Sequence, residues 1–223
     1  MRIYGICFCI FLSTFCVGAY NHPKFKTKEN LKVLLLGNSM TFHTASEKIG
    51  WIGNWGMAAS SEDKDFVHLL KVELLSKYKK LDFRYYNVAN TFEKNYQNID
   101  ITNYTNFRNF EPDILIIRLG DNIQMDDFNA GSLKVSLENL VKFIDPKSKV
   151  FISSRFWSNQ VIDNTIKECA NKNKWIFVDI SSLGEISENM SGNRFENKGV
   201  GMHPSDLGMQ RIKDKIWEKL KHI

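Results

Sequence analysis

The sequence LKVLLLGNSMTFH, residues 31–43, is the strongest local indication of the fold. It begins as a run of branched apolar residues, which is typical of a strand buried on both faces, and the run stops abruptly at Gly37, Asn38 and Ser39. Gly37 allows a tight turn that would hold Ser39 at the tip of the strand with its side chain exposed above the sheet. A glycine and a serine after a strand more often form an ordinary turn or helix cap, so this stretch needs support from elsewhere in the chain.

The rest of the chain alternates short apolar runs with amphipathic stretches. Further strands are predicted at FRYYNVA, DILIIRLG, KVFISSRF and WIFVDIS, which begin at Phe83, Asp113, Lys149 and Trp175. Apolar residues spaced by three and four predict helices that begin near Asp65, Ser132, Gln160 and Asp206. This alternation predicts an α/β fold, a three-layer α/β/α sandwich around a five-stranded parallel sheet, flavodoxin-like in strand order, as a single domain over residues 20–223.

Residues 1–19, MRIYGICFCIFLSTFCVGA, have the features of a secretory signal peptide. Arg2 precedes an apolar run that closes on small residues, which predicts cleavage after Ala19. An uncleaved anchor and lipidation of Cys16 are the alternatives. Three of the 4 cysteines lie in this segment and leave only Cys169, so the mature chain has no internal disulfide. We therefore expect a secreted or periplasmic protein without stable membrane insertion after cleavage.

Composition excludes several classes of function. With 43% hydrophobic and 25% charged residues, the chain can bury the core of one globular domain. The net charge of +5 comes from lysines interspersed with acidic residues along the helices, which indicates a solvated surface and no nucleic-acid partner. The 5 histidines show no metal-ligand spacing, so we expect no metal and no cofactor. The sequence does not indicate an oligomeric state.

Two later stretches support a chemical role for Ser39. A serine hydroxyl needs a base to take its proton and donors to hold the oxyanion that forms when it attacks an acyl carbonyl. The third strand ends in RLGDNIQ, where Asn122 offers a side-chain amide, and the last helix is preceded by GVGMHPSDLGM, where His203 can reach the tip of the first strand.

The segments Gly37-Asn38-Ser39, Gly120-Asp121-Asn122 and His203-Pro204 resemble the blocks of the SGNH (GDSL-like) hydrolase family. The resemblance covers nearly the whole mature chain, and the insertion GWIGNWGMAASS looks like those of exported bacterial relatives with carbohydrate-linked roles. It implies a flavodoxin-like fold and ester hydrolysis, with Ser39 as nucleophile and His203 as base. The Ser39 backbone N–H, Asn122 and the Gly120 turn would form the oxyanion hole.

The chain departs from the family pattern at two functional positions. Val200 stands three residues before His203, where the family has its acid, so either a backbone carbonyl from NKGVGM orients the histidine in a Ser-His dyad or Glu196 or Asp179 reaches in. The loop after the second strand, NVANTFE, lacks the glycine that supplies the family's other oxyanion donor. The N–H of Ala89 or Asn90 would substitute, or the hole is weaker.

Aromatic and basic side chains near the predicted site suggest how substrate binds. Trp51 and Trp55 either stack on sugar faces or pin their loop to the sheet, and His43 follows the serine closely enough to line the site. Trp157 lies on the same edge, and Arg155 beside it could hold an acidic group.

Together these features predict an exported serine esterase that removes a small, acetyl-like group from a carbohydrate, with a small-molecule or glycan ester as its partner. The alternatives are an inactive glycan-binding module on the same fold, an acyltransferase and a lipid esterase.

Overall fold

The computed structural model describes Met1 and residues 30–223, so the predicted signal peptide lies outside the described residues apart from Met1. The sheet has five parallel strands in the order β2-β1-β3-β4-β5, which is the flavodoxin-like order. The strands are β1 (Asn30–Gly37), β2 (Lys80–Asn87), β3 (Ile114–Ile117), β4 (Lys149–Ser153) and β5 (Ile176–Val178). The predicted fold class is confirmed.

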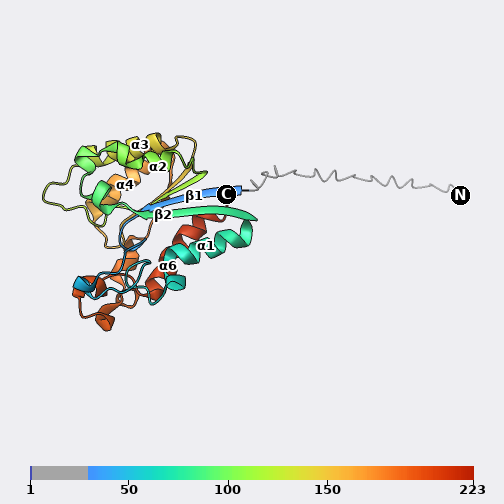
Figure 1. Cartoon of the computed structure of the whole chain (residues 1–223). Helices are drawn as coiled ribbons and strands as arrows, with labels where there is room; N and C mark the ends of the chain where they lie inside the picture. The colour runs from blue at the N-terminus through green and yellow to red at the C-terminus, as the bar shows by residue number, and fades with distance from the viewer. Residues whose placement is uncertain (2–29) are drawn as a thin grey trace.

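Helices cover both faces of the sheet, as Figure 1 shows. On one face α1 (Phe66–Lys77) packs against α6 (Asp206–Leu220). On the other face α3 (Ala130–Ile144) packs against α4 (Gln160–Asn173) and the short α2 (Thr105–Arg108). The sheet is therefore the middle layer of three.

Each layer of helices encloses its own apolar core. Successive side chains of a strand point to opposite faces of the sheet, and those of β1 do so here. Leu34 and Leu36 lie in the core beside α3 and α4, whereas Val33 and Leu35 lie in the core beside α1 and α6. β1 is buried on both sides, which explains why its sequence is continuously apolar.

The remaining elements are short and lie mostly in the loops after the strands. A π-helical turn, η3 (Ala89–Glu93), follows β2, and α5 (Lys198–Gly201) precedes α6. The 3₁₀ turns span Glu47–Ile49, Glu62–Lys64, Tyr96–Asn98, Ile101–Tyr104, Ser181–Glu185, Ser187–Asn189 and Gly192–Arg194. In the described part of the chain, no helix has the length and apolar character needed to cross a membrane.

The strands end earlier than their apolar runs predict, and this creates the site. β3 stops at Ile117, and β4 stops at Ser153, so the residues that follow turn out of the sheet. β1 lies between β2 and β3, which places a topological switch point at its carboxyl end. Ser39 follows β1 and Asn122 follows β3, so both lie at the crevice where ligands bind in open parallel sheets.

Candidate active site

Close packing shapes the turn that carries Ser39. A Cβ added to Gly37 would lie 1.9 Å from Thr41 Oγ1 and 3.3 Å from the Arg118 carbonyl oxygen, so only glycine fits there. The backbone turns back immediately, because Thr41 N–H donates to the Asn38 carbonyl at 2.9 Å. Ser39 is half-buried, and its own N–H donates to no other described residue. The turn therefore presents both a hydroxyl and a free backbone donor at the tip of β1.

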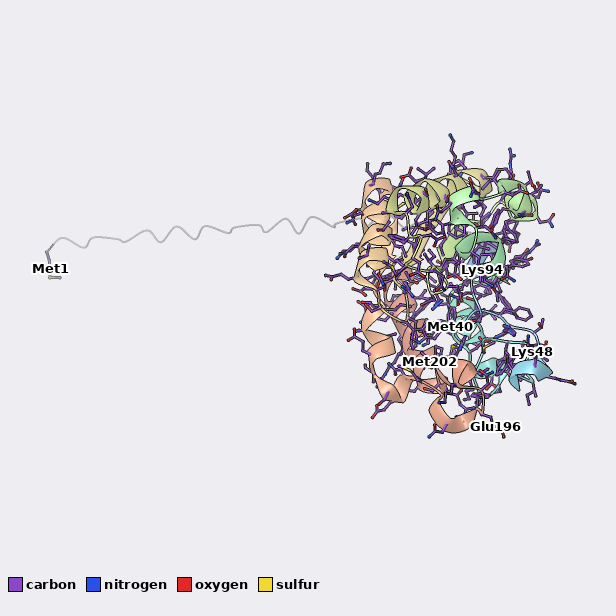
Figure 2. The ribbon with its side chains drawn as sticks, turned by 90° about the vertical axis from the view of Figure 1, so that its left-hand side faces the viewer. Met1, Met40, Lys48, Lys94, Glu196 and Met202 are labelled. Carbon is purple, nitrogen blue, oxygen red and sulfur yellow. The ribbon has the colours of Figure 1, made fainter. Side chains whose placement is uncertain are left out.

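His203 meets Ser39 from the loop between α5 and α6. Ser39 Oγ lies 2.8 Å from His203 Nε2, although 164 residues separate them in sequence. His203 Nδ1 lies 2.8 Å from the Gly199 carbonyl oxygen, and a carbonyl only accepts, so Nδ1 carries the proton and Nε2 accepts from the serine. Figure 2 labels Met40, which follows Ser39 in the chain, and Met202, which precedes His203. Both labels lie in the middle part of the molecule.

The two acids considered for His203 lie elsewhere. Asp179 accepts hydrogen bonds from Ser154 and Ser181. Glu196 is exposed and lies at the lower edge of the molecule in Figure 2. Within residues 30–223 no carboxylate lies within hydrogen-bond distance of His203. The arrangement is a serine and a histidine oriented by a backbone carbonyl.

The environment keeps the His203 ring neutral. Burial lowers the pKa of His203 to about 4, and this outweighs the Gly199 hydrogen bond and the Asp121 charge, which raise it. At pH 7 the imidazole therefore has a free lone pair on Nε2 and can take the Ser39 proton.

The Gly120–Asn122 turn is held from behind by a carboxylate that no sequence motif indicated. Gly120 has φ +128°, which a residue with a side chain rarely adopts. Glu93 Oε1 accepts from Gly120 N–H at 2.5 Å, and Oε2 accepts from Asn122 Nδ2 at 2.5 Å. The Gly120 N–H is therefore engaged by Glu93 and is not free to donate to an oxyanion, which contradicts the predicted place of Gly120 in the oxyanion hole. Asn122 Nδ2 has a second hydrogen, which is free of this contact.

The loop after β2 also differs from expectation. Ala89 N–H donates to Asn87 Oδ1 at 3.0 Å, so the prediction that it replaces the missing glycine donor is wrong in this structure. The Asn90 N–H donates to no acceptor outside η3 among the described residues, and its role stays a prediction. Glu93 is the last residue of η3, and no motif in NVANTFE indicates that it has a role in the site. The one indication in this segment is a charged residue that directly follows the buried Phe92.

A buried ion pair joins the turns after β1 and β3. Arg118 is fully buried and donates Nη2 to Asp121 Oδ2 at 2.8 Å and Nη1 to Asn38 Oδ1 at 3.0 Å. Asn38 Nδ2 in turn donates to Asp121 Oδ2 at 2.9 Å. Burying the charges of Arg118 and Asp121 costs free energy, which their mutual contact offsets. Removing either side chain would leave the other charge buried without a partner.

We expect Arg118→Met to lower the free energy of unfolding by about 3–5 kcal/mol, because it leaves Asp121 buried without its cation. Urea denaturation measures this loss. The control is Arg84→Met, which removes the half-exposed Arg84–Asp82 pair and should cost far less. Equal losses in the two variants would show that the buried pair contributes no more than a surface one.

The tryptophans of the insertion after Ser39 hold their own loop together. Trp51 is 2% exposed, packs edge-on against Trp55 and donates Nε1 to the His43 carbonyl. Trp55 is half-buried and donates Nε1 to the Ala59 carbonyl. The stacking prediction is wrong for Trp51, and the alternative, that these rings pin the loop, describes both. The spacing of the apolar residues did not predict the burial of Trp51, because the loop is neither an α-helix nor a strand and it folds back on itself.

Other predicted substrate residues lie at or behind the site. Trp157 contacts the His203 ring edge-on, with centroids 5.3 Å apart. Arg155 donates Nη2 to the Asp121 carbonyl, and its stem lies against Gly120, so it packs behind the turn. Its contact with an acidic substrate group stays a prediction. The described residues hold no group of 3 or more His, Cys, Asp or Glu side chains suited to a metal ion.

A cleft of about 610 Å³ opens beside the Ser39 turn. His43 lines it, as do the residues Phe42, Thr44, Tyr85, Tyr86, Asn87 and Asn90. Asn87 pairs with Gly37 in the β1–β2 register, which places the cleft at the carboxyl ends of these strands. A larger cavity of about 1090 Å³ includes Lys32 and Asp113 at the amino ends of β1 and β3, so it lies at the wrong edge of the sheet for this chemistry.

Comparison with known proteins supports the fold assignment. No protein-family model matches the sequence, and no curated protein matches it either. Among solved structures, the psychrotrophic esterase EstA from Pseudoalteromonas sp., inhibited by monoethylphosphonate, is 14% identical with a TM-score of 0.58, over 86% of this chain and 98% of that one.

Two further solved structures are carbohydrate esterases. A two-domain esterase active on acetylated mannans is 18% identical with a TM-score of 0.56, over 86% of this chain and 49% of that one. The acetyl xylan esterase AlAXEase is 15% identical with a TM-score of 0.54, over 85% of this chain and 99% of that one. At these identities the likeness establishes the fold.

Proposed function

We propose that this chain, which has the fold of the SGNH hydrolases, is an exported serine esterase that removes a small acyl group from a carbohydrate. The observation that carries the proposal is the 2.8 Å contact between Ser39 Oγ and His203 Nε2, with Nδ1 of the same ring on the Gly199 carbonyl. A nucleophile, a base and a group that orients the base are the minimum for acyl transfer through a serine.

The first half-reaction forms an acyl-enzyme. Ser39 Oγ attacks the ester carbonyl carbon while its proton passes to His203 Nε2. The carbonyl oxygen becomes an oxyanion, which the Ser39 N–H and Asn122 Nδ2 stabilise. The bond from the carbonyl carbon to the alcohol oxygen then breaks, and the alcohol leaves with the proton from His203.

The second half-reaction releases the acid. Water attacks the acyl-enzyme carbonyl and gives its proton to His203 Nε2, and the same donors hold the second oxyanion. The Ser39–acyl bond then breaks, Ser39 Oγ regains a proton from His203, and the carboxylic acid leaves. Gly199 compensates the imidazolium by one hydrogen bond from Nδ1, where a triad would use a carboxylate.

The cleft lined by Phe42 and His43, which follow Ser39 closely in the chain, favours a sugar as the alcohol part of the ester. It combines the rings of Phe42, Tyr85 and Tyr86 with the amides of Asn87 and Asn90, and none of the described residues that line it is a Lys, Arg, Asp or Glu. The Asn87 amide donates to the Phe42 carbonyl, whereas the Tyr86 hydroxyl and the Asn90 side-chain amide make no hydrogen bond within the described residues. Aromatic faces with free neutral polar groups suit a polyhydroxylated ring better than a fatty acyl chain or an anion. Two of the structural neighbours are named for action on acetylated mannans and on acetyl xylan, which supports the same class.

Release of acetate from acetylated oligosaccharides of mannose and xylose tests this function. We expect acetate to accumulate together with the deacetylated sugar, and no transfer of acetyl to an added sugar alcohol. Binding of the sugars without acetate release would support the glycan-binding module instead. Activity confined to long-chain esters would support a lipid esterase. Export is tested separately by whether the mature chain in the extracellular or periplasmic fraction begins after Ala19.

Tyr86 offers a test of the sugar assignment. It is 39% exposed, and its ring lies over Phe107 with centroids 4.7 Å apart, so one side of it is supported. We expect Tyr86→Ala to raise KM for an acetylated oligosaccharide about 2- to 12-fold, the equivalent of about 0.5–1.5 kcal/mol of aromatic contact. The rate on p-nitrophenyl acetate, which lacks a sugar, should not change. Tyr86→Phe keeps the ring and should stay near the wild type; equal KM values for all three proteins would exclude stacking at this ring.

A further inference from the structure

The carboxylate of Glu93 is buried, and within residues 30–223 its hydrogen bonds come from the two turns of the candidate active site. The side chain is 1% exposed and lies at the end of η3, just before Lys94, which Figure 2 labels. Its Oε1 accepts from Gly120 N–H at 2.5 Å and Asn38 Nδ2 at 3.3 Å, and its Oε2 accepts from Asn122 Nδ2 at 2.5 Å. Burying a carboxylate costs free energy unless hydrogen bonds offset it, so a buried carboxylate beside a candidate active site is a candidate for a functional role.

Only a carboxylate satisfies these partners. Every group that hydrogen-bonds to Glu93 is an N–H donor, including the Asn122 backbone N–H at 3.4 Å. An ionised carboxylate accepts at both oxygens, whereas a glutamine would turn an NH₂ group toward one of the donors. Burial, and to a smaller extent the Asp121 charge, raise the pKa of Glu93, and the hydrogen bonds from Asn122 Nδ2, Gly120 N–H and Asn38 Nδ2 act in the opposite direction.

Glu93 does not act on the histidine. Its side-chain hydrogen bonds are to Asn38, Gly120 and Asn122, and none of the described hydrogen bonds joins it to His203. Its strongest contacts are with the Gly120–Asn122 turn, at 2.5 Å, whereas the contact with Asn38 is longer at 3.3 Å, so we assign its effect on the reaction to that turn. The amide of Asn122 is the only group among these partners that the proposed reaction uses.

We propose that Glu93 is a positioning residue that fixes the Asn122 amide with Nδ2 toward the substrate oxygen. This inference rests on the proposed function. One hydrogen of Nδ2 is bound by Glu93 Oε2, which leaves the other to donate to the oxyanion. Without the carboxylate the amide can turn over, and Oδ1 would then repel the oxyanion. Glu93 also occupies Gly120 N–H, so it leaves Asn122 as the donor from this turn.

The isosteric variant Glu93→Gln tests the proposal on p-nitrophenyl acetate. Its NH₂ group favours the turned-over amide, so we expect kcat to fall about 10²- to 10³-fold, as for loss of one oxyanion donor, while KM stays nearly constant. Glu218→Gln, on the exposed side of α6, is the matched control and should behave as the wild type. Thermal unfolding of each variant shows that it is folded.

A double-mutant cycle separates positioning from a structural role. If Glu93 acts through Asn122, then Glu93→Gln in an Asn122→Ala background changes kcat by less than about twofold. A structural role would instead lower kcat by the same factor in both backgrounds. Glu93→Asp keeps two acceptor oxygens and should recover part of the lost rate. If Glu93→Gln does not fold, Glu93→Asp takes its place in the cycle.

The outcomes distinguish this inference from the function on which it rests. If Ser39→Ala loses activity but Glu93→Gln stays within about twofold of the wild type, or the cycle is additive, the positioning role is wrong and the esterase remains. If Ser39→Ala is as active as the wild type, the serine mechanism is wrong and the positioning role fails with it.

Discussion

Ser39→Ala is expected to lower kcat on p-nitrophenyl acetate by roughly 10⁴- to 10⁶-fold, because the variant has no group that can form the acyl-enzyme. The Oγ atom lies 2.8 Å from the base, His203 Nε2, and alanine removes it without adding bulk. Release of p-nitrophenol, followed by absorbance, measures the rate. The fold should persist, since the hydroxyl makes no other hydrogen bond in the described structure.

Ser182→Ala is the matched control, because Ser182 is exposed and lies in a 3₁₀ turn outside the site. It should retain the wild-type rate. Covalent labelling by an alkyl phosphonate that carries a leaving group adds a readout independent of turnover. Mass spectrometry should find the adduct on Ser39 in the wild type and none in Ser39→Ala. A rate unchanged by Ser39→Ala would disprove the nucleophile assignment and make glycan binding the leading function.

His203→Ala is expected to lower kcat by a similar factor, because the serine loses its base. His222→Ala, near the end of the chain, is the control and should have the wild-type rate. Because the ring is oriented by a backbone carbonyl, no substitution of Glu196 or Asp179 should reproduce this loss. A loss of comparable size in Asp179→Asn or Glu196→Gln would show that a carboxylate reaches His203 during the reaction.

The pH profile of kcat/KM gives a second test of His203. Only the neutral ring accepts the serine proton, and burial lowers its pKa from 6.5 to about 4. Activity should therefore be nearly constant from neutral pH down to about pH 5 and fall as the pH drops through about 4. A profile that already falls through pH 6.5 would indicate a solvated histidine. The measurement needs a substrate whose spontaneous hydrolysis is slow across this range.

The fold could be predicted from local patterns because its central strands are buried on both faces. In a continuous apolar run such as Leu34 to Leu36, side chains on both faces of the strand are apolar, so both faces must be covered. The helices between the strands each have an apolar face that can cover one side of the sheet. The strand ends were less predictable. The apolar runs continue past Ile117 and Ser153, but the backbone leaves the sheet at these residues. The residues that follow contact loops whose positions cannot be predicted from the sequence.

The site was predictable only where a motif carries the chemistry. Ser39, Asn122 and His203 stand in motifs, and the structure brings Ser39 and His203 into contact. The sequence left two roles open for Trp51 and did not decide whether Ala89 donates to the oxyanion; their groups are engaged locally, in an aromatic cluster and in a hydrogen bond to Asn87. Glu93 was missed because its partners lie 27 to 55 residues away, beyond any local pattern.

From the amino acids alone we could predict the alternation of strands and helices, the order of the three motifs and the lack of an acid three residues before His203, where Val200 stands. These follow from side-chain polarity and spacing, which act over a few residues. Three features depend on how the whole chain packs: the contact of the Gly199 carbonyl with His203 Nδ1, the contact of the Glu93 carboxylate with Asn122, and the burial of Trp51. Such contacts depend on how loops from distant strands pack at one edge of the sheet, and loop packing has no period that can be read along the chain.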